Sequence, residues 1–298
     1  MKTIPWLVIS FLLAGCGSDL GNAVADGGGQ GATTDLSALS DGFDSAASLA
    51  KWQRVEKVEG WNNDQLERVD AGTTRAGWLT MVPYTSTWYQ DYRGILLFKP
   101  VTGDFMVTAK LHVSGRTGGG PPRAQFSLGG LMIRTPRTIT PSTWRRGTEN
   151  YVFLSAGAAN EPGRFQFEVK TTINSDSQLV TAPAPSGDAL IRLVRVGESV
   201  IALRNSGDGW TVHRRYRRGD FPATLQVGMT CYTDYPGASR MDPPTHNRSV
   251  IRNGNPDLIA QYDYVRFARP KVPSSLAGRA LDDPSISDAQ LLAFLGGA

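Results

Sequence analysis

The chain has 298 residues, with 31 Lys or Arg against 27 Asp or Glu, so its formal net charge is only +4. Because these charges are spread along the chain, the composition argues against a nucleic-acid-binding protein and against a surface that adheres strongly to membranes. About 280 residues remain after a short N-terminal leader, which is enough for one large β domain or two small ones.

The leader is typical of secretion. One lysine precedes an apolar run from Ile4 to Leu13, and this run is too short to span a hydrocarbon core, which needs roughly twenty residues. It leads into Leu-Ala-Gly-Cys at residues 13–16, which resembles the bacterial lipobox. The resemblance implies that residues 1–15 are a lipoprotein signal peptide and that Cys16 carries a lipid anchor. An ordinary signal peptide that happens to contain a cysteine is the alternative.

The residues after the anchor predict a location and a tether. Gly17 rather than Asp follows the cysteine, which favours an outer membrane lipoprotein of the bacterial cell envelope, either periplasmic or surface-exposed. Residues 16–40 are mostly Gly, Ala, Ser, Thr and Asp. Such a segment buries too little apolar surface to fold, so we expect a flexible tether.

Cys231 is the only other cysteine. With Cys16 consumed by lipid, no disulfide within the chain is expected. The apolar stretch 225–231 predicts a buried, inert thiol rather than a nucleophile, which would need an accessible and electropositive setting.

Residues 41–269 have the pattern of an all-β fold, with short runs rich in Val, Ile, Phe, Tyr and Trp between clusters of Gly, Pro, Asn and Asp. Phe165–Lys170 alternates strictly, which predicts one buried and one wet face. Residues 189–203 predict a hairpin with a two-residue turn at Gly197. No segment of this region has a helical period. The expected strands are Gly94–Lys99, Phe105–Val113, Gly129–Arg134, Tyr151–Ala156, Arg164–Lys170, Ala189–Val196, Ser199–Asn205, Trp210–Arg215, Thr224–Thr230 and Gln261–Ala268.

Residues 270–298 form a distinct C-terminal extension that begins with two prolines, Pro270 and Pro273. Ser287 followed three residues later by Gln290 has the spacing of a capping box. The sequence therefore predicts one short helix that ends near Gly296. Its leucines and phenylalanine should pack on the sandwich or on a partner.

Five motifs follow one another along the chain: Asp41–Asp44, Val101–Phe105, Gly129–Arg134, Ser206–Trp210 and Tyr262–Phe267. In this order they resemble the bacterial concanavalin A-like lectin and glucanase domains, especially their laminin-G-like branch. The resemblance covers residues 41–269. It implies a two-sheet antiparallel jelly-roll sandwich whose concave face often meets glycans, an analogy of fold rather than of function.

The residues needed for catalysis are not obvious. Glycosidases use two carboxylates that flank the scissile bond, and the Glu-x-Asp-x-x-Glu pattern of glucanases with this fold is absent. Glu56 and Glu59 are expected on opposite faces of a strand, and Glu149 and Glu168 appear isolated in the sequence. A lyase would need a Tyr or His base beside Arg and an amide, for which the candidates are Tyr151, Gln166, His213, Arg134 and Arg192.

Sugar binding requires less, namely aromatic platforms with a few amides or arginines. The aromatic cluster in residues 77–93 and the long loop 135–149 supply Trp88, Tyr92 and Trp144. Together with Arg134 and Gln166 these are the predicted ligand-binding residues. Trp52 and Trp210 are expected in the core. A polar loop that begins at residues 232–235 could border the same surface.

Two charged features are weighed as ligand sites. The basic run His213–Arg218 could hold an anionic polysaccharide or a lipid headgroup through arginine, although a solvated strand is the usual explanation. We expect no cofactor. A structural calcium ion held by Asp41, Asp44 and Asp263 is a possibility without supporting ligand spacing.

We therefore favour a lipid-anchored carbohydrate-binding or cell-surface recognition domain without catalysis. A polysaccharide-degrading enzyme, a lyase rather than a hydrolase, is the alternative. A structural subunit of a surface complex is the third hypothesis. The sequence indicates neither the glycan nor the oligomeric state.

Overall fold

The computed structural model describes residues 35–297. The expected signal peptide, the lipidation site Cys16 and most of the expected tether lie outside the described residues. The end of that tether is part of the fold: Ser37–Leu39 form a 3-10 helix, Leu36 is buried, and the Lys99 ammonium donates a hydrogen bond of 2.7 Å to the Leu39 carbonyl. Residues 36–40 therefore belong to the sandwich.

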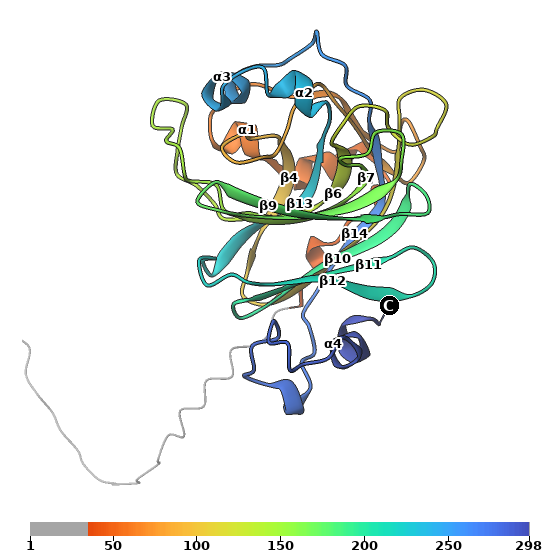
Figure 1. Ribbon diagram of the computed structural model, residues 1–298, viewed down its shortest axis with the longest axis vertical. Coiled ribbons are helices and arrows are strands. Elements are labelled where there is room, and N and C mark those ends of the chain that lie inside the picture. The colour runs from red at the N-terminus through yellow and green to blue at the C-terminus, as the bar shows by residue number, and fades with distance from the viewer. Residues whose placement is uncertain (1–34, 298) are drawn as a thin grey trace, which may run out of the picture. The chain divides into compact units, whose positions relative to one another are not determined.

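Two seven-stranded sheets pack face to face, and all neighbouring strands are antiparallel (Figure 1). Every strand expected from the sequence is present, so the predicted two-sheet sandwich is confirmed. Sheet I has the order β1 (Gln53–Arg54), β4 (Ile95–Thr102), β13 (Thr224–Tyr232), β6 (Ser127–Arg134), β7 (Tyr151–Ala158), β8 (Gln166–Ile173) and β9 (Asp176–Pro183). Sheet II has the order β12 (Trp210–Arg217), β11 (Ser199–Asn205), β10 (Asp188–Val196), β5 (Phe105–Ser114), β14 (Ile259–Ala268), β3 (Leu79–Pro83) and β2 (Leu66–Ala71).

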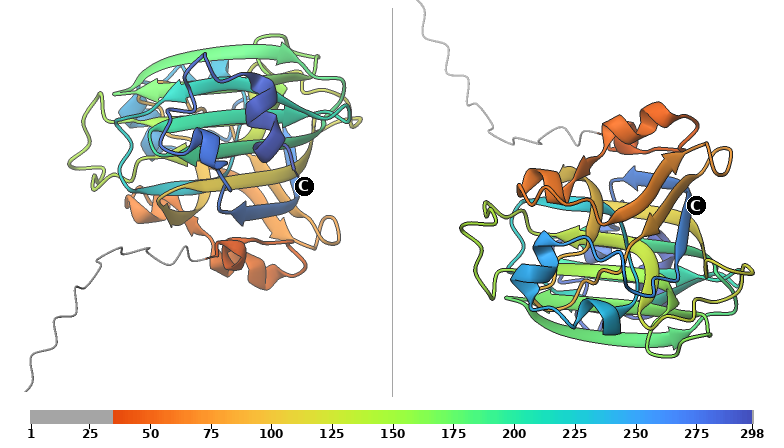
Figure 2. Two further views of the ribbon diagram at one scale, coloured as in Figure 1. Left: turned by 90° about the horizontal axis from the view of Figure 1, so that it is seen from below. Right: turned by 90° about the horizontal axis from the view of Figure 1, so that it is seen from above.

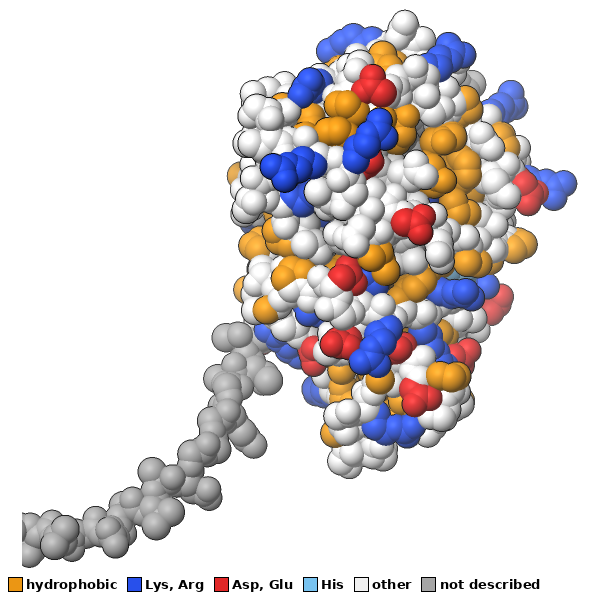
Figure 3. Space-filling model, turned by 60° about the vertical axis from the view of Figure 1, so that its left-hand side comes forward, with side chains coloured by type: hydrophobic (Ala, Val, Ile, Leu, Met, Phe, Trp, Pro, Cys, Tyr) orange, Lys and Arg blue, Asp and Glu red, His pale blue; other side chains and the backbone are white. Residues whose placement is uncertain are grey.

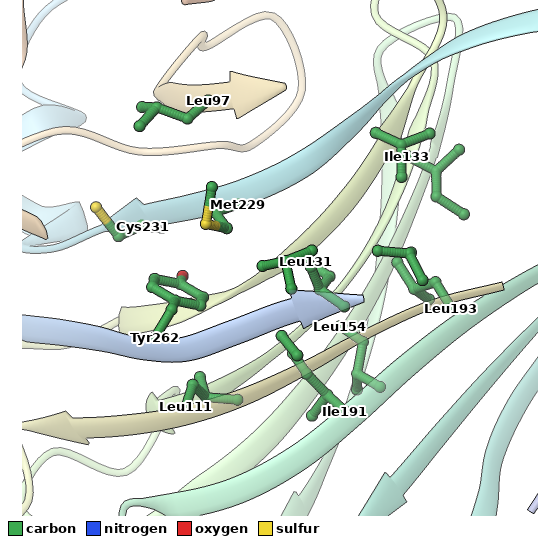
Figure 4. Close-up of a cluster of buried hydrophobic side chains, with 14 of the residues drawn as sticks. Leu97, Leu111, Leu131, Ile133, Leu154, Ile191, Leu193, Met229, Cys231 and Tyr262 are labelled. Carbon is green, nitrogen blue, oxygen red and sulfur yellow. The ribbon is translucent and has the colours of Figure 1, made fainter. Parts of the chain in front are cut away.

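The core lies between the sheets and is built by alternation along the strands. Leu131 and Ile133 of sheet I face Ile191 and Leu193 of sheet II, and all four are fully buried (Figure 4). Burial of each such side chain stabilises the fold by about 1.5–3 kcal/mol. Cys231 lies in the same core, where burial raises its pKa, so the prediction of a buried thiol is confirmed.

The predicted hairpin is also confirmed. Val196 of β10 pairs with Ser199 of β11, and Gly197 in the turn has a φ of 56°, a conformation that glycine adopts without steric cost. The sequence did not predict β1, β2, β3 and β9. In two of these strands, β2 and β9, buried and exposed residues alternate only weakly, because both are edge strands with many polar, partly exposed residues.

Both outer faces of the sandwich are covered. Three single-turn helices lie over sheet I: α1 (Val55–Val58), α2 (Tyr235–Ala238) and α3 (Pro243–Arg248) (Figures 1 and 2). The sequence predicted no helix in this region, because one turn is too short to show a helical period. Two of the helices are fixed by aspartate caps, Asp234 before α2 and Asp242 before α3.

The C-terminal extension covers sheet II, as Figure 2 shows from below. Its helix α4 (Asp288–Leu295) has the predicted capping box between Ser287 and Gln290 and ends at Gly296. Leu291 and Leu295 are fully buried against Ile201 and Leu203 of β11. The extension therefore packs on the sandwich of its own chain. Within residues 35–297, no helix is long and apolar enough to cross a membrane.

We expect Leu291→Ala to lower the free energy of unfolding by about 2–5 kcal/mol, because it leaves a cavity between α4 and sheet II. Leu292, on the same helix, is only partly buried, so Leu292→Ala is the matched control and should cost clearly less. Urea unfolding of both variants measures the difference. Equal losses would contradict the packing described for α4.

Candidate functional site

The hollow of sheet I is filled by Trp88, one of the predicted sugar-binding residues. This side chain is fully buried. Its Nε1 donates a hydrogen bond of 3.0 Å to the Ile95 carbonyl, and its ring meets Tyr151 edge-on at a centroid distance of 5.5 Å. Position 94 must be glycine, because a Cβ there would lie 2.7 Å from the Trp88 ring. The structure thus corrects the prediction that Trp88 is an exposed platform.

Arg134, a second predicted ligand, lies in a buried network of ion pairs. Its Nε donates to Glu149 at 2.8 Å, its Nη2 donates to Glu59 at 2.6 Å, and its Nη1 donates to the Gln226 amide oxygen at 2.7 Å. Arg137 pairs with both glutamates as well. Because Arg134 is fully buried and its guanidinium is engaged on every nitrogen, it is unavailable to a ligand.

The glutamates that seemed scattered in the sequence are therefore structural. Glu56 and Glu59 are both buried at helix α1 rather than on opposite faces of a strand. Burial alone would raise the pKa of Glu59, but the charges of Arg134 and Arg137 outweigh it and lower that pKa to about 2. Glu149 is not isolated either, since it shares these arginines.

The remaining predicted ligand-binding residues do not meet at one site. Gln166 is buried, and its Oε1 accepts hydrogen bonds of 3.1 Å from the Ala159 and Glu161 amides, so its side chain holds the β7–β8 connection. Tyr92 is half-buried and donates to the Met241 carbonyl at 2.8 Å. Trp144 is half-buried in its loop.

A small open pocket remains on this face, and none of the five predicted residues lines it. Its volume is about 170 Å³. We call it the aromatic pocket; it is lined by Thr87, Tyr89, Phe126, Lys170, Leu179 and Tyr235. The Tyr235 ring meets the rings of Tyr89 and Phe126 edge-on, each at a centroid distance of 5.7 Å. Two tyrosines and one phenylalanine thus form its walls.

Lys170 lies among these rings. Its Nζ donates hydrogen bonds to the Trp88 carbonyl at 2.8 Å and to Glu168 Oε1 at 3.1 Å. Its Nζ lies 5.5 Å from the centroid of the Tyr89 ring and 5.8 Å from that of Phe126, within the range of cation–π attraction. Burial lowers the pKa of Lys170, and Glu168 opposes that effect. The third ammonium hydrogen has no acceptor within residues 35–297.

The backbone around the pocket is strained. Gln90, Phe126 and Asp234 all have φ values between 50° and 61°, which is uncommon for residues other than glycine and costs about 1–3 kcal/mol each. Phe126 is itself a wall of the pocket, whereas Gln90 directly follows Tyr89 and Asp234 directly precedes Tyr235. Strain of this kind clusters at binding sites, where the surrounding structure maintains it.

Asp234 stabilises the strained backbone next to Tyr235. Its buried carboxylate accepts hydrogen bonds from the Thr85 hydroxyl at 2.7 Å, the Asn255 amide at 2.7 Å and the Gly237 amide at 3.1 Å. These three residues belong to three separate covering segments. Asp234 therefore fixes the position of Tyr235 relative to the segment that carries Tyr89.

The constellation expected of a lyase is not assembled. Tyr151, Arg134 and Gln166 project from sheet I and are buried, whereas His213 and Arg192 belong to strands β12 and β10 of sheet II. Burial also lowers the pKa of His213 to about 4. The five candidates therefore cannot act on one substrate.

Neither a metal cluster nor a free basic patch emerges from the other candidates. Within residues 35–297, no three His, Cys, Asp or Glu side chains are grouped as metal ligands. The Asp41 carboxylate, a candidate for calcium, instead accepts hydrogen bonds from the Phe43 amide, the Ser48 hydroxyl and the Trp52 indole.

The basic run at residues 213–218 is largely occupied by ion pairs. Arg215 pairs with Asp288, Arg217 with Glu198, and the buried Arg218 with Asp220. On the face drawn in Figure 3, basic and acidic side chains are interspersed. These contacts support a structural role for the run.

Sequence reasoning missed Lys170 because strict alternation placed it on a wet face. In the structure both faces of β8 are buried, with Gln166, Glu168 and Lys170 under the covering segments. Tyr235 lies in the polar loop that was expected to border the site. A lysine that directly follows the alternating run from Phe165 to Val169, with aromatic loops elsewhere, was the available signal.

Comparisons with known proteins support the fold. A GH43 protein from Bacillus licheniformis superposes with a TM-score of 0.51 at 14% identity, over 77% of this chain and 39% of that one. A functionally unknown protein from Saccharomyces cerevisiae gives 0.48 at 12%, over 74% and 98%. A legume lectin-like domain from Entamoeba histolytica gives 0.40 at 7%, over 64% and 84%. No family model and no curated protein matches the chain.

We expect Arg134→Met to lower the free energy of unfolding by about 3–5 kcal/mol, because it leaves Glu59 and Glu149 buried with less compensation. Arg164, which is exposed and paired only with Glu161, is the control, and Arg164→Met should change stability by less than about 0.5 kcal/mol. Urea unfolding at neutral pH measures both. A mild effect at position 134 would contradict the network.

Proposed function

We propose that the chain is a lipid-anchored, non-catalytic domain that recognises carbohydrate, and that the aromatic pocket holds one sugar unit. The observation that carries this proposal is the pocket itself: three aromatic rings around a buried ammonium in the hollow of sheet I. Its strained walls favour a binding role over a purely structural one.

The chemistry of the pocket suits a neutral sugar. Aromatic rings pack against the apolar face of a pyranose, while a few fixed polar groups orient its hydroxyls. The free hydrogen of Lys170 is such a donor. Because Glu168 balances the charge of Lys170 at 3.1 Å, the pocket offers a hydrogen bond without an uncompensated positive charge.

The fold and the carboxylates support the same class of function. The two-sheet fold is shared with a GH43 protein at a TM-score of 0.51, and the sequence motifs resemble lectin-like domains; both are likenesses of fold. Glu59, Glu149 and Glu168 are fully buried and paired with Arg or Lys. A glycosidase needs two carboxylates that reach the substrate, so we place recognition ahead of hydrolysis.

We expect Tyr235→Ala to weaken glycan binding by at least about tenfold, or about 1.4 kcal/mol. The test passes the chain from Gly17 onward over a panel of neutral plant, algal and bacterial polysaccharides in affinity gels. Trp144→Ala is the matched control, because Trp144 is half-buried in another loop and does not line the pocket.

Retention that is lost in Tyr235→Ala and kept in Trp144→Ala supports the proposal. Reducing ends or unsaturated uronates released in the same samples would identify an enzyme instead. No retention on any glycan would favour a structural subunit of a surface complex.

The location is proposed from the lipobox-like residues 13–16 and Gly17. We expect the full-length chain, expressed in a Gram-negative bacterium, to incorporate radiolabelled palmitate and to fractionate with the outer membrane. Cys16→Ser should lose the label, because the thiol that accepts the lipid is removed. A labelled Cys16→Ser protein, or an unlabelled wild type, would exclude the lipid anchor at this position.

A further inference from the structure

A second and larger cavity lies on the outer face of sheet II, beside the end of the C-terminal helix. Its volume is about 690 Å³, within the range of known ligand sites. We call it the cationic cleft. Its lining includes Thr108, Arg192, Asn205, Trp210, Tyr264 and Arg266, together with apolar residues such as Met106, Leu190 and Phe267.

Strand register places two arginines in one row across the floor of the cleft. Arg192 of β10 pairs with Thr108 of β5, and Thr108 pairs with Arg266 of β14. Directly paired residues share a face of the sheet. Because neighbouring strands are about 4.8 Å apart, the two arginine backbones lie about 10 Å apart, with a threonine hydroxyl between them.

Arg192 carries a buried charge without a carboxylate partner. Its Nε donates to the Thr108 hydroxyl at 2.7 Å, and its Nη1 donates to the carbonyls of Leu295 and Gly297. The guanidinium lies 4.2 Å from the centroid of the Trp210 ring. Its Nη2 has no acceptor within residues 35–297. By contrast, two glutamates surround the equally buried Arg134.

Arg266 is exposed and faces the same cleft. Its guanidinium lies 4.0 Å above the centroid of the Tyr264 ring, and it makes no ion pair with any residue from 35 to 297. Stacking on an aromatic ring holds a guanidinium in a fixed plane while its N–H groups stay free for a carboxylate. Among residues 35–297, these two oriented cations therefore have no carboxylate partner.

We propose that the cationic cleft is a second ligand site, separate from the aromatic pocket, that binds the carboxylates of an acidic glycan built from uronic acids. The two arginines take carboxylates, and the Thr108 hydroxyl and the Asn205 amide take hydroxyl groups of the sugar. Sites on opposite sheets let one chain hold two glycan segments at once.

The observations favour a glycan over a lipid surface. A membrane-binding site needs apolar side chains that can enter the acyl region. The large apolar residues that are most exposed within residues 35–297 are Val58, Ile173 and Val180. None of them lines the cleft, and Ile173 and Val180 belong to strands β8 and β9 of sheet I.

The test titrates tri-galacturonate, tri-mannuronate and tri-glucuronate into the chain from Gly17 onward, which retains every described residue, by calorimetry. The uncharged methyl ester of each trisaccharide is the ligand control. We expect at least one free acid to bind, its methyl ester to bind about tenfold more weakly or worse, and binding to weaken as salt is raised.

Single substitutions test whether the acidic trisaccharide binds in the cationic cleft. Arg266→Ala should reduce binding about tenfold. Arg252→Ala is the matched control, since Arg252 is also exposed and stacked on a tyrosine, Tyr84, at 4.6 Å, yet does not line the cleft; it should bind like the wild type. Tyr235→Ala should also bind like the wild type, which separates this proposal from that for the aromatic pocket.

Four outcomes would overturn the proposal: no binding of any trisaccharide acid, equal binding of the methyl esters, an equal loss in Arg252→Ala, or a loss in Tyr235→Ala alone. The last would place the acid in the aromatic pocket and leave glycan recognition there intact. Vesicles of phosphatidylglycerol are added as a separate probe; binding to them without binding to the trisaccharides would assign the cleft to a lipid headgroup. Near-UV circular dichroism confirms that each variant is folded.

Discussion

The balanced charge of Arg134 is the constraint on which the covered face of sheet I depends. Glu59 reaches it from the C-terminal cap of helix α1, and Glu149 from the loop that precedes β7, so two segments distant in sequence meet over one strand. The Trp88 ring then lies 5.5 Å from the guanidinium. Because the ion pairs satisfy the buried charges without water, aromatic side chains can pack over this face, and the space between Tyr89, Phe126 and Tyr235 stays open.

The sequence predicted the strands well because their pattern is local. Alternation along residues 165–170 identified β8, and the Ser287–Gln290 spacing identified the start of α4. The predicted wet face of β8 is wrong, because local alternation does not show whether a face is covered. That depends on the segment around Trp88, which is far from β8 in sequence and covers Lys170 through its own backbone carbonyl. Non-local packing of this kind leaves no periodic signal.

The sequence indicated that the candidate site would contain aromatic side chains, but not which residues would supply them. The aromatic segments of the sequence led to the prediction of a sugar site, yet Trp88 is part of the core, and Tyr235, at the start of helix α2, forms a wall of the pocket. The deciding features are the left-handed backbones at Phe126 and Asp234. Phenylalanine rarely adopts that conformation and aspartate does so only at particular positions, so composition and spacing give no indication of it.

The bond between Arg192 and the carbonyls of Leu295 and Gly297 ties the last turn of the chain to the middle of a sheet. For anyone preparing the protein, the two ends of the chain are therefore not equivalent places for a purification tag. A tag fused after Ala298 would begin two residues beyond the anchored Gly297 carbonyl, close to the cationic cleft that Gly296 lines. An acidic linker there would compete for the same arginines, because its carboxylates offer them the same ion pairs.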